Sequence, residues 1–163
     1  MKVNVSDIIR VNGDSMQVDF IEEPTEKELV NGCVLSDKVQ FSGTLTNELG
    51  SLRLEGRLQL RYSCECFRCL KPVSKDLNIK INESFTSSDN AEQNDLYSFE
   101  GKILDTDKAL RDNIILNLPM QNLCSERCKG LCEKCGANLN EMQCKCEDDE
   151  IDPRLEGLSK FFE

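Results

Sequence analysis

Cysteines are the residues of this chain whose type and spacing point to chemistry. Six of the chain's ten cysteines lie between residues 124 and 146, in the segment CSERCKGLCEKCGANLNEMQCKC. A segment this short cannot bury enough apolar surface to fold by packing alone. Disulfides or inert buried thiols are the alternative to a metal. We favour a metal, because cysteines in a reducing compartment rarely form stable disulfides.

The second half of this segment predicts one zinc site of zinc-ribbon type. Cys132 and Cys135 form a C-x-x-C pair, and Gly136 after it allows a tight turn. Cys144 and Cys146 follow after eight residues and would complete the site. Zinc prefers four ligands in tetrahedral geometry, with thiolates at about 2.3 Å.

A second four-thiolate site is predicted from the cysteines that remain unassigned. Cys66 and Cys69 form an isolated C-x-x-C in YSCECFRCLKPV, and they would combine with Cys124 and Cys128. Such a site would close a long loop and so constrain the unfolded chain. The alternative is a single zinc ion shared within the 124–146 segment. Cys66 and Cys69 would then be a reduced pair or, because Arg68 lies between them, a redox switch.

Composition limits the classes of function. The chain has a net charge of −10 and no histidine, which excludes Ser-His-Asp and Cys-His catalysis and every zinc site that needs histidine. Four-thiolate sites are closed and make poor Lewis acids, so we expect no enzyme and no small-molecule substrate. No apolar run reaches the length of a secretory signal or a membrane span. These features predict a soluble, cytoplasmic protein.

Alternating apolar residues between Lys38 and Phe85 predict three antiparallel strands in a meander, with a hairpin turn at Asn47–Ser51. Leu110, Ile114 and Leu118 recur at helical spacing after a cap at Asp105 or Thr106, and Pro119 ends this helix. The helix most simply covers the apolar face of the sheet. The predicted fold class is therefore α+β, with a meander that is either an open sheet or a small barrel.

The remaining segments define the expected organisation. Residues 16–20 alternate like a strand, residues 24–30 predict one helical turn or a loop, and residues 96–104 predict one more strand. Cys33, among apolar neighbours, is expected to be a buried thiol. After the acidic run at residues 147–150, a short helix is expected from Asp152. We divide the chain into a β-rich domain with its covering helix, residues 1–118, and a small Cys-rich zinc-binding lobe with the C-terminal helix, residues 119–163.

Basic side chains cluster in one part of this acidic chain. Arg53, Arg57 and Arg61 share one face of a predicted strand, and the turn that follows adds Arg68 and Lys71. An ordinary solvated strand face explains this pattern as well as a contact surface for an acidic partner does. RNA phosphate would be the first such partner. No aromatic residue lies among the strand arginines, so stacking on single-stranded bases is not predicted.

Three stretches give the chain a family resemblance: CFRCLKPV, LRDNIILNLPM, and CKGLCEKCGANLN followed by CKC and IDPRLEGL. With these motifs, residues 38–163 resemble the YceD family, the large ribosomal RNA subunit accumulation proteins of bacteria and plastids. The resemblance implies a non-enzymatic role in the biogenesis of the large ribosomal subunit, through accumulation, processing or assembly of its 23S RNA. The resemblance implies that the cysteines are metal ligands, and it implies no catalytic residue.

Two functions follow as expectations. In the first, the protein is a ribosome-biogenesis factor that contacts large-subunit RNA or a precursor particle through Arg53, Arg57, Arg61, Arg68 and Lys71, with one or two zinc ions as structural staples. In the second, the acidic chain is a protein-binding module that holds a basic ribosomal protein before assembly.

Overall fold

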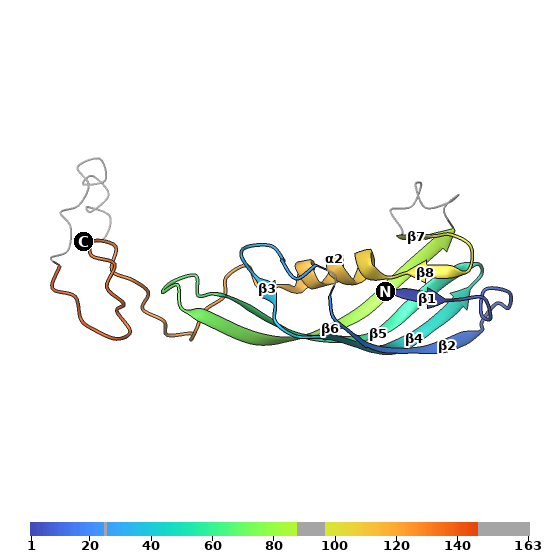
Figure 1. The fold of residues 1–163 in the computed structure, drawn as a ribbon, viewed down its shortest axis with the longest axis horizontal. Helices are drawn as coiled ribbons and strands as arrows, with labels where there is room; N and C mark the ends of the chain where they lie inside the picture. The colour runs from blue at the N-terminus through green and yellow to red at the C-terminus, as the bar shows by residue number, and fades with distance from the viewer. Residues whose placement is uncertain (25, 88–96, 147–163) are drawn as a thin grey trace, which may run out of the picture.

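An extended β-sheet forms the body of the molecule. The computed structural model describes residues 1–24, 26–87 and 97–146, and Figure 1 shows its elongated shape. The larger sheet has the order β2-β4-β5-β6-β7, with β3 paired to β5, and the smaller sheet consists of β1 and β8. The strands are β1 (Lys2–Asn4), β2 (Ser15–Glu22), β3 (Val34–Leu35), β4 (Val39–Glu48), β5 (Ser51–Glu65), β6 (Pro72–Ser87), β7 (Tyr97–Phe99) and β8 (Ile103–Asp105).

The predicted meander is confirmed in strands β4, β5 and β6, which pair antiparallel in sequence order. Glu48 pairs with Ser51, so the first hairpin has a two-residue loop, and both loop residues, Leu49 and Gly50, have positive φ. This conformation matches the twist of the flanking strands. The alternation is also as predicted: in β5 the apolar side chains at even positions are buried, and the odd positions face solvent or are partly covered.

Two glycines create a close approach between β4 and β5. Gly43 and Gly56 are opposite each other in the register. A Cβ atom on Gly56 would lie 2.5 Å from the carbonyl oxygen of Ser42 and 2.6 Å from the ring of Phe41. The Phe41 ring, which is almost fully buried, therefore occupies the space that side chains at this pair would need.

The helix α2 (Asp107–Asn117) covers the inner face of the large sheet (Figure 1). Ala109, Leu110 and Ile114 are buried in the same core as the inner residues of β4, β5 and β6. Thr106 is the N-cap residue of α2, which was one of the two residues predicted for this position. The side chain that accepts a hydrogen bond here is that of Asp105, whose carboxylate accepts from the N–H of Asp107. Among the described residues, the edge strands β2 and β7 do not pair with each other. The sheet is therefore open, and the barrel alternative is wrong.

One local expectation needs correction. The segment at residues 96–104 is not one strand: β7 pairs parallel with β6, whereas β8 pairs with β1, and Gly101 between them has a φ of 65°. For residues 24–30 the loop alternative is the right one: the described residues there form no helical turn, and Glu28 makes an isolated bridge to Val34. The expected acidic run and C-terminal helix, residues 147–163, lie outside the described residues. No helix in the described part of the chain is long and apolar enough to cross a membrane.

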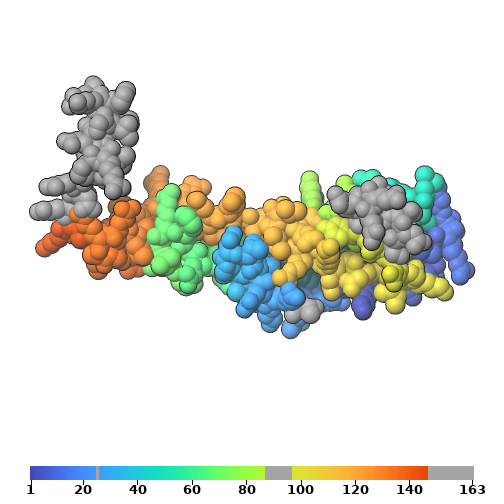
Figure 2. Space-filling model, turned by 90° about the horizontal axis from the view of Figure 1, so that it is seen from above, coloured from blue at the N-terminus to red at the C-terminus, as the bar shows by residue number. Residues whose placement is uncertain are grey.

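The cysteine-rich segment lies at one end of the long sheet. After α2 the chain runs back along the sheet to the turn between β5 and β6, and residues 119–146 follow beyond that turn (Figure 1). Seen from above, the β5–β6 turn and the residues of the cysteine-rich segment are packed against each other (Figure 2). This arrangement brings together cysteines that are far apart in sequence.

Candidate metal centre

The turn between β5 and β6 holds the first two cysteines. The N–H of Cys66 donates to the carbonyl of Lys71 at 2.8 Å, and the N–H of Leu70 donates to the carbonyl of Cys66 at 2.9 Å. These bonds fold CFRC into a tight loop with both sulfurs on one side. The loop requires positive φ at Leu70, which has a φ of 58°. That value is unfavourable for a residue with a Cβ atom.

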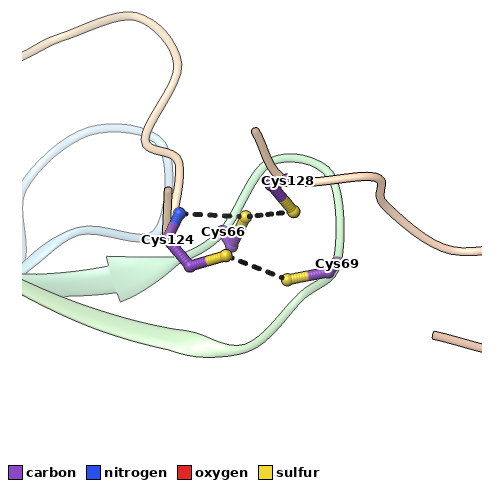
Figure 3. A group of neighbouring side chains, drawn as sticks. All are labelled: Cys66, Cys69, Cys124 and Cys128. Carbon is purple, nitrogen blue, oxygen red and sulfur yellow. Dashed lines mark hydrogen bonds between the residues drawn. The ribbon is translucent and has the colours of Figure 1, made fainter. Parts of the chain in front are cut away.

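Cys124 and Cys128 complete a four-sulfur group with this loop, as Figure 3 shows. The Sγ atoms of Cys66 and Cys128 are 3.9 Å apart, and those of Cys69 and Cys124 are 3.6 Å apart. In a regular tetrahedron, Zn–S bonds of 2.3 Å place neighbouring sulfurs at about 3.8 Å. All four sulfurs lie within 4.8 Å of one another. The donor set and its spacing therefore fit a tetrahedral zinc ion.

The electrostatics of this group favour a bound cation. Burial raises the pKa of Cys66, but N–H groups of the backbone, first that of Cys124 and then that of Cys69, lower the pKa of the Cys66 thiol to about 6. Hydrogen bonds to Cys128 and Cys69 raise the pKa of Cys124 to about 12. Thiolates this close repel each other, so all four ionise together only with a divalent cation between them.

Cys132, Cys135, Cys144 and Cys146 form a second group, with their sulfurs also within 4.8 Å of one another. Its C-x-x-C loop repeats the first one: the N–H of Gly136 donates to the carbonyl of Cys132, and the N–H of Cys132 donates to the carbonyl of Ala137. Gly136 has a φ of 70° and occupies the position of Leu70 in the first loop. N–H groups of Cys135 and Lys134 lower the pKa of Cys132 to about 6.

The chain between the two groups binds them together. The N–H of Leu131 donates to the carbonyl of Arg68 at 3.1 Å, and the N–H of Leu139 donates to the carbonyl of Gly130 at 3.0 Å. Gly130 has a φ of 80°, and a Cβ atom there would be 3.1 Å from the Arg68 carbonyl oxygen. Glycine is therefore required both for the conformation and for the close approach.

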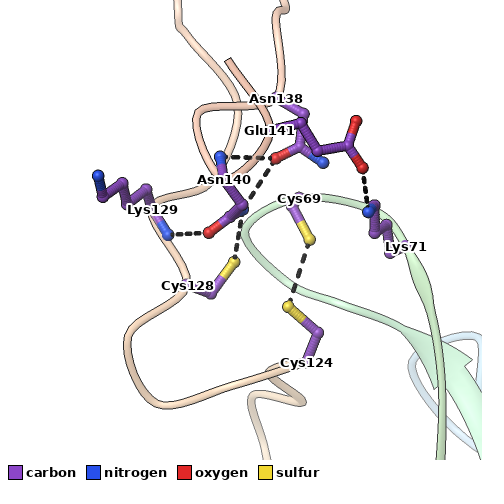
Figure 4. Close-up of polar contacts among 8 residues, drawn as sticks. All are labelled: Cys69, Lys71, Cys124, Cys128, Lys129, Asn138, Asn140 and Glu141. Carbon is purple, nitrogen blue, oxygen red and sulfur yellow. Dashed lines mark hydrogen bonds and ion pairs between the residues drawn. The ribbon is translucent and has the colours of Figure 1, made fainter. Parts of the chain in front are cut away.

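Asn140 makes a side-chain connection from the second group to the first (Figure 4). Its Nδ2 donates to the Sγ of Cys128 at 3.4 Å, and its Oδ1 accepts from the N–H of Lys129 at 2.8 Å. In Figure 4, Lys71 beside the first loop also forms an ion pair with Glu141. Contacts of this kind around metal ligands orient the ligands and tune their affinity for metal.

A buried amide attaches the first group to the sheet. Asn122, which is 6% exposed, accepts at Oδ1 from the hydroxyl of Tyr62 in β5 at 2.9 Å. Its backbone carbonyl accepts from the N–H of Phe67 at 2.7 Å. The segment that carries Cys124 therefore has a defined position relative to both β5 and the CFRC loop.

The predicted partner-contact residues lie in different surroundings. Arg53, Arg57 and Arg61 share the outer face of β5, and the CFRC turn carries Arg68 and Lys71. Arg53 forms ion pairs with Glu48 and Glu55, and Arg61 forms ion pairs with Asp76 and Asp37.

Arg68 donates to the carbonyl of Cys128, and Lys71 pairs with Glu141. Arg57 is exposed and has no ion pair within the described part of the chain. Four of the five predicted cationic side chains therefore already have partners inside the protein.

Two cysteines belong to neither group. Cys33 is 2% exposed, as expected for a buried thiol, and Cys64 is 7% exposed. The pairing of Val34 with Ser63 places Cys33 next to β5 close to Cys64. Burial is the main reason that the pKa of Cys64 is raised to about 11, which makes this thiol a poor nucleophile at neutral pH.

Sequence reasoning missed three residues that shape the site: Leu70, Asn122 and Asn140. Leu70 could have been found by aligning the two C-x-x-C motifs, because Gly136 occupies the matching position. No sequence signal distinguished the two asparagines, since their partners lie 60 and 12 residues away in the chain.

Comparison with known proteins identifies relatives of this chain. A family model described as "Large ribosomal RNA subunit accumulation protein YceD" matches residues 54–162. The "Large ribosomal RNA subunit accumulation protein YCED homolog 1, chloroplastic" of Zea mays is 28% identical over 155 residues, which cover 74% of this chain and 51% of that protein. The homologue of the same name from Arabidopsis thaliana is 43% identical over 64 residues, or 39% of this chain and 20% of that protein.

A bacterial relative extends over nearly the whole chain. "Uncharacterized protein YlbN" of Bacillus subtilis is 23% identical over 163 residues, which cover 98% of this chain and 84% of that protein. No solved structure matches this chain. The chain spans about half the length of the maize relative. Because the family model matches more than half of the chain and includes all eight grouped cysteines, the protein belongs to the YceD family.

Proposed function

We propose that this protein is a non-enzymatic factor that supports accumulation of the large-subunit (23S) ribosomal RNA in the cytoplasm, with two zinc ions as structural staples. The observation that carries the proposal is membership of the YceD family, together with the names of the maize and Arabidopsis relatives. The RNA itself or a precursor particle is the proposed partner.

The zinc ions are proposed as staples because of where the first group lies. Its ligands come from the β5–β6 turn and from the segment after α2, so one ion would join the β-rich domain, residues 1–118, to the lobe that begins at residue 119. With four thiolates, each site would be closed, which leaves no open position for a substrate. The chain also has no histidine. Both features support a structural rather than a catalytic role for zinc.

Arg57 is the cation to test first as a contact to RNA. It is exposed on the outer face of β5, opposite Lys80 in β6. Its neighbours along the strand, Arg53 and Arg61, would have to give up their carboxylate partners to bind phosphate. We therefore expect reversal of Arg57 to weaken RNA contact more than reversal of Arg53 does.

Depletion of the protein tests the proposed function. Cells without it should show a lower ratio of large-subunit to small-subunit ribosomal RNA, and the wild-type gene should restore this ratio. The Cys66→Ser/Cys128→Ser variant should fail to restore it, whereas Cys33→Ala should restore it. An unchanged ratio after complete depletion would refute the function.

Purification of the tagged protein with and without nuclease identifies the partner. Recovery of large-subunit RNA or precursor particles only in the untreated half supports RNA contact, and Arg57→Glu should then reduce the yield. Recovery of a basic ribosomal protein after nuclease treatment supports the second candidate function, an acidic module that holds such a protein before assembly. That candidate is favoured by one observation: Asp14, Asp19, Glu22 and Glu23 form no ion pair within the described residues.

A further inference from the structure

One edge of the large sheet is unpaired among the residues that the structure describes. On one side, β2 pairs with β4 over its whole length, from Ser15 with Thr46 to Glu22 with Val39. On its other side no described strand pairs with it, and β2 is the outermost strand of this sheet in Figure 1. Such an edge presents alternate N–H and C=O groups that another extended chain can bind.

The edge lacks the lysine and proline residues that often prevent strand addition. Edge strands are commonly protected by lysine or proline. No lysine or arginine occurs from Val11 to Glu26, and β2 itself contains no proline. Its exposed side chains include Asp19 and Glu22, and Ile21 is 62% exposed. The edge is therefore open for backbone pairing, and its charge is negative.

The negative charge is not neutralised within the described protein. The carboxylates of Asp14 and Asp19 accept only local hydrogen bonds, from the N–H of Ser15 at 3.2 Å and from the side-chain amide of Gln17 at 3.5 Å. Glu22 and Glu23 form no ion pair within the described residues, although Lys108 and Arg111 line the same cavity. Arg111 is paired with nearby Glu26. Unpaired carboxylates along a free edge favour a partner segment with lysine or arginine.

A cavity of about 370 Å³ lies next to the end of β2, between the loop that follows this strand and α2. Its apolar lining includes Phe20 and Leu35 from the sheet and Leu110 from α2, and Glu22 and Glu23 lie among its lining residues. A strand added beside β2 would direct alternate side chains to the same face as Phe20. One apolar side chain of an added strand could then enter this cavity, and the basic side chains that alternate with it would lie on the opposite face, beside Asp19.

A second copy of the chain fits this edge less well. Two β2 strands paired antiparallel about Val18 would place Gln17 opposite Asp19, which is favourable. The same register places Glu22 directly opposite Asp14, and this like-charge pair occurs twice in a symmetric dimer. Repulsion between these carboxylates disfavours self-pairing in this register, whereas a basic partner segment complements the charge of the edge.

We propose that the free edge of β2 binds an extended, lysine- and arginine-rich segment of a partner protein by strand addition, with an apolar side chain of that segment in the cavity beside Phe20. This inference rests on the second candidate function and names its binding site. It does not depend on zinc or on contact with RNA. The binding assay below uses purified components, so its failure is distinguishable from a failure of the depletion experiment.

Peptide binding to the full-length protein tests the proposal. The probe is a fluorescent peptide, acetyl-Lys-Val-Arg-Val-Lys-Val-Arg-amide, and the control peptide has proline at each valine position. The control keeps the charge but cannot extend a sheet. We expect the probe to bind at least tenfold more tightly than the control. We also expect β2 amide hydrogens that face away from β4 to exchange more slowly when the probe is bound.

Charge reversal locates the site. Asp19→Lys/Glu22→Lys should weaken binding of the probe by tenfold or more. The matched variant Glu65→Lys/Glu100→Lys changes the net charge equally, at exposed positions at the end of β5 and after β7, and it should bind as the wild type does. Thermal melting and circular dichroism should show that both variants are folded.

Three outcomes would overturn the proposal. The first is equal binding of the two peptides, or no binding of the probe, and the second is an equal loss of binding in both double variants. The third is a wild-type dimer in sedimentation equilibrium that Asp19→Lys/Glu22→Lys converts to monomer, because the edge would then be an interface between copies of this chain.

Discussion

The Sγ atoms of Cys66 and Cys128 lie 3.9 Å apart, although 62 residues separate them in sequence. Between them the chain completes β6, β7, β8 and α2. A metal ion at this point would close a long loop and connect the end of the sheet to the cysteine-rich segment. The second group, by contrast, closes a loop within residues 132–146 only.

Loss of the first group should therefore affect stability more than loss of the second. We expect the wild type to bind about two zinc ions per chain, and Cys66→Ser/Cys128→Ser and Cys132→Ser/Cys144→Ser to bind about one each. Closure of the longer loop restricts the unfolded chain more strongly, so the first variant should have the lower melting temperature. Elemental analysis and thermal melting measure both effects, with Cys33→Ala as the control that keeps both ions. Equal melting temperatures of the two double variants would contradict this order.

Asn140→Ala should weaken zinc binding at the first group, although Asn140 lies in the loop of the second. The substitution removes the hydrogen bond to the Sγ of Cys128 and the one from the N–H of Lys129. Loss of such outer contacts typically reduces metal affinity by about 10–100-fold. Competition with a chelator measures the affinity of each site. Met142→Ala, an exposed neighbour, is the control, and an unchanged affinity in Asn140→Ala would show that the contact has no effect on the metal.

Leu70 and Gly136 should respond in opposite ways to exchange of their side chains. Both have positive φ at the same position of a C-x-x-C loop. A side chain in this conformation costs about 1–2 kcal/mol, and glycine loses more entropy on folding by about 0.5–1 kcal/mol. Leu70→Gly should thus be neutral or stabilise the protein by up to about 1 kcal/mol, and Gly136→Leu should destabilise its loop. Denaturant unfolding of the zinc-loaded protein measures the first effect and chelator competition the second. Destabilisation by Leu70→Gly would mean that the exposed leucine makes a contact that outweighs the strain.

Gly56→Ala should destabilise the protein by about 1–3 kcal/mol. The new methyl group would overlap the carbonyl of Ser42 and the ring of Phe41, which are 2.5 and 2.6 Å from the ideal Cβ position. The free energy of unfolding from denaturant titration measures this cost. Ser42→Ala, at an exposed position beside the same contact, is the matched control and should change stability by less than about 0.5 kcal/mol. A Gly56→Ala protein as stable as the wild type would show that the strands separate at this point without cost.

The local elements of this protein follow from sequence patterns because their physical causes are local. Alternation along residues 38–85 corresponds to the two faces of a strand, so β4, β5 and β6 could be predicted. Helical spacing and Pro119 were sufficient for α2. The two C-x-x-C motifs indicated metal chemistry because the chemical preference of thiolates for zinc does not depend on the fold.

The division of eight cysteines into two groups was a prediction from the pairs left unassigned, and the tertiary structure shows the sulfurs in those groups. The open sheet, the free edge of β2 and the neutralised arginines could not be predicted, because each depends on which strand or carboxylate lies beside a residue in space. Arg61 and Asp76 illustrate the reason: 15 residues separate them, and only the antiparallel register of β5 and β6 places them opposite each other. Spacing in sequence determined the chemistry that this chain can perform, and long-range pairing determined which of its charges remain available to a partner.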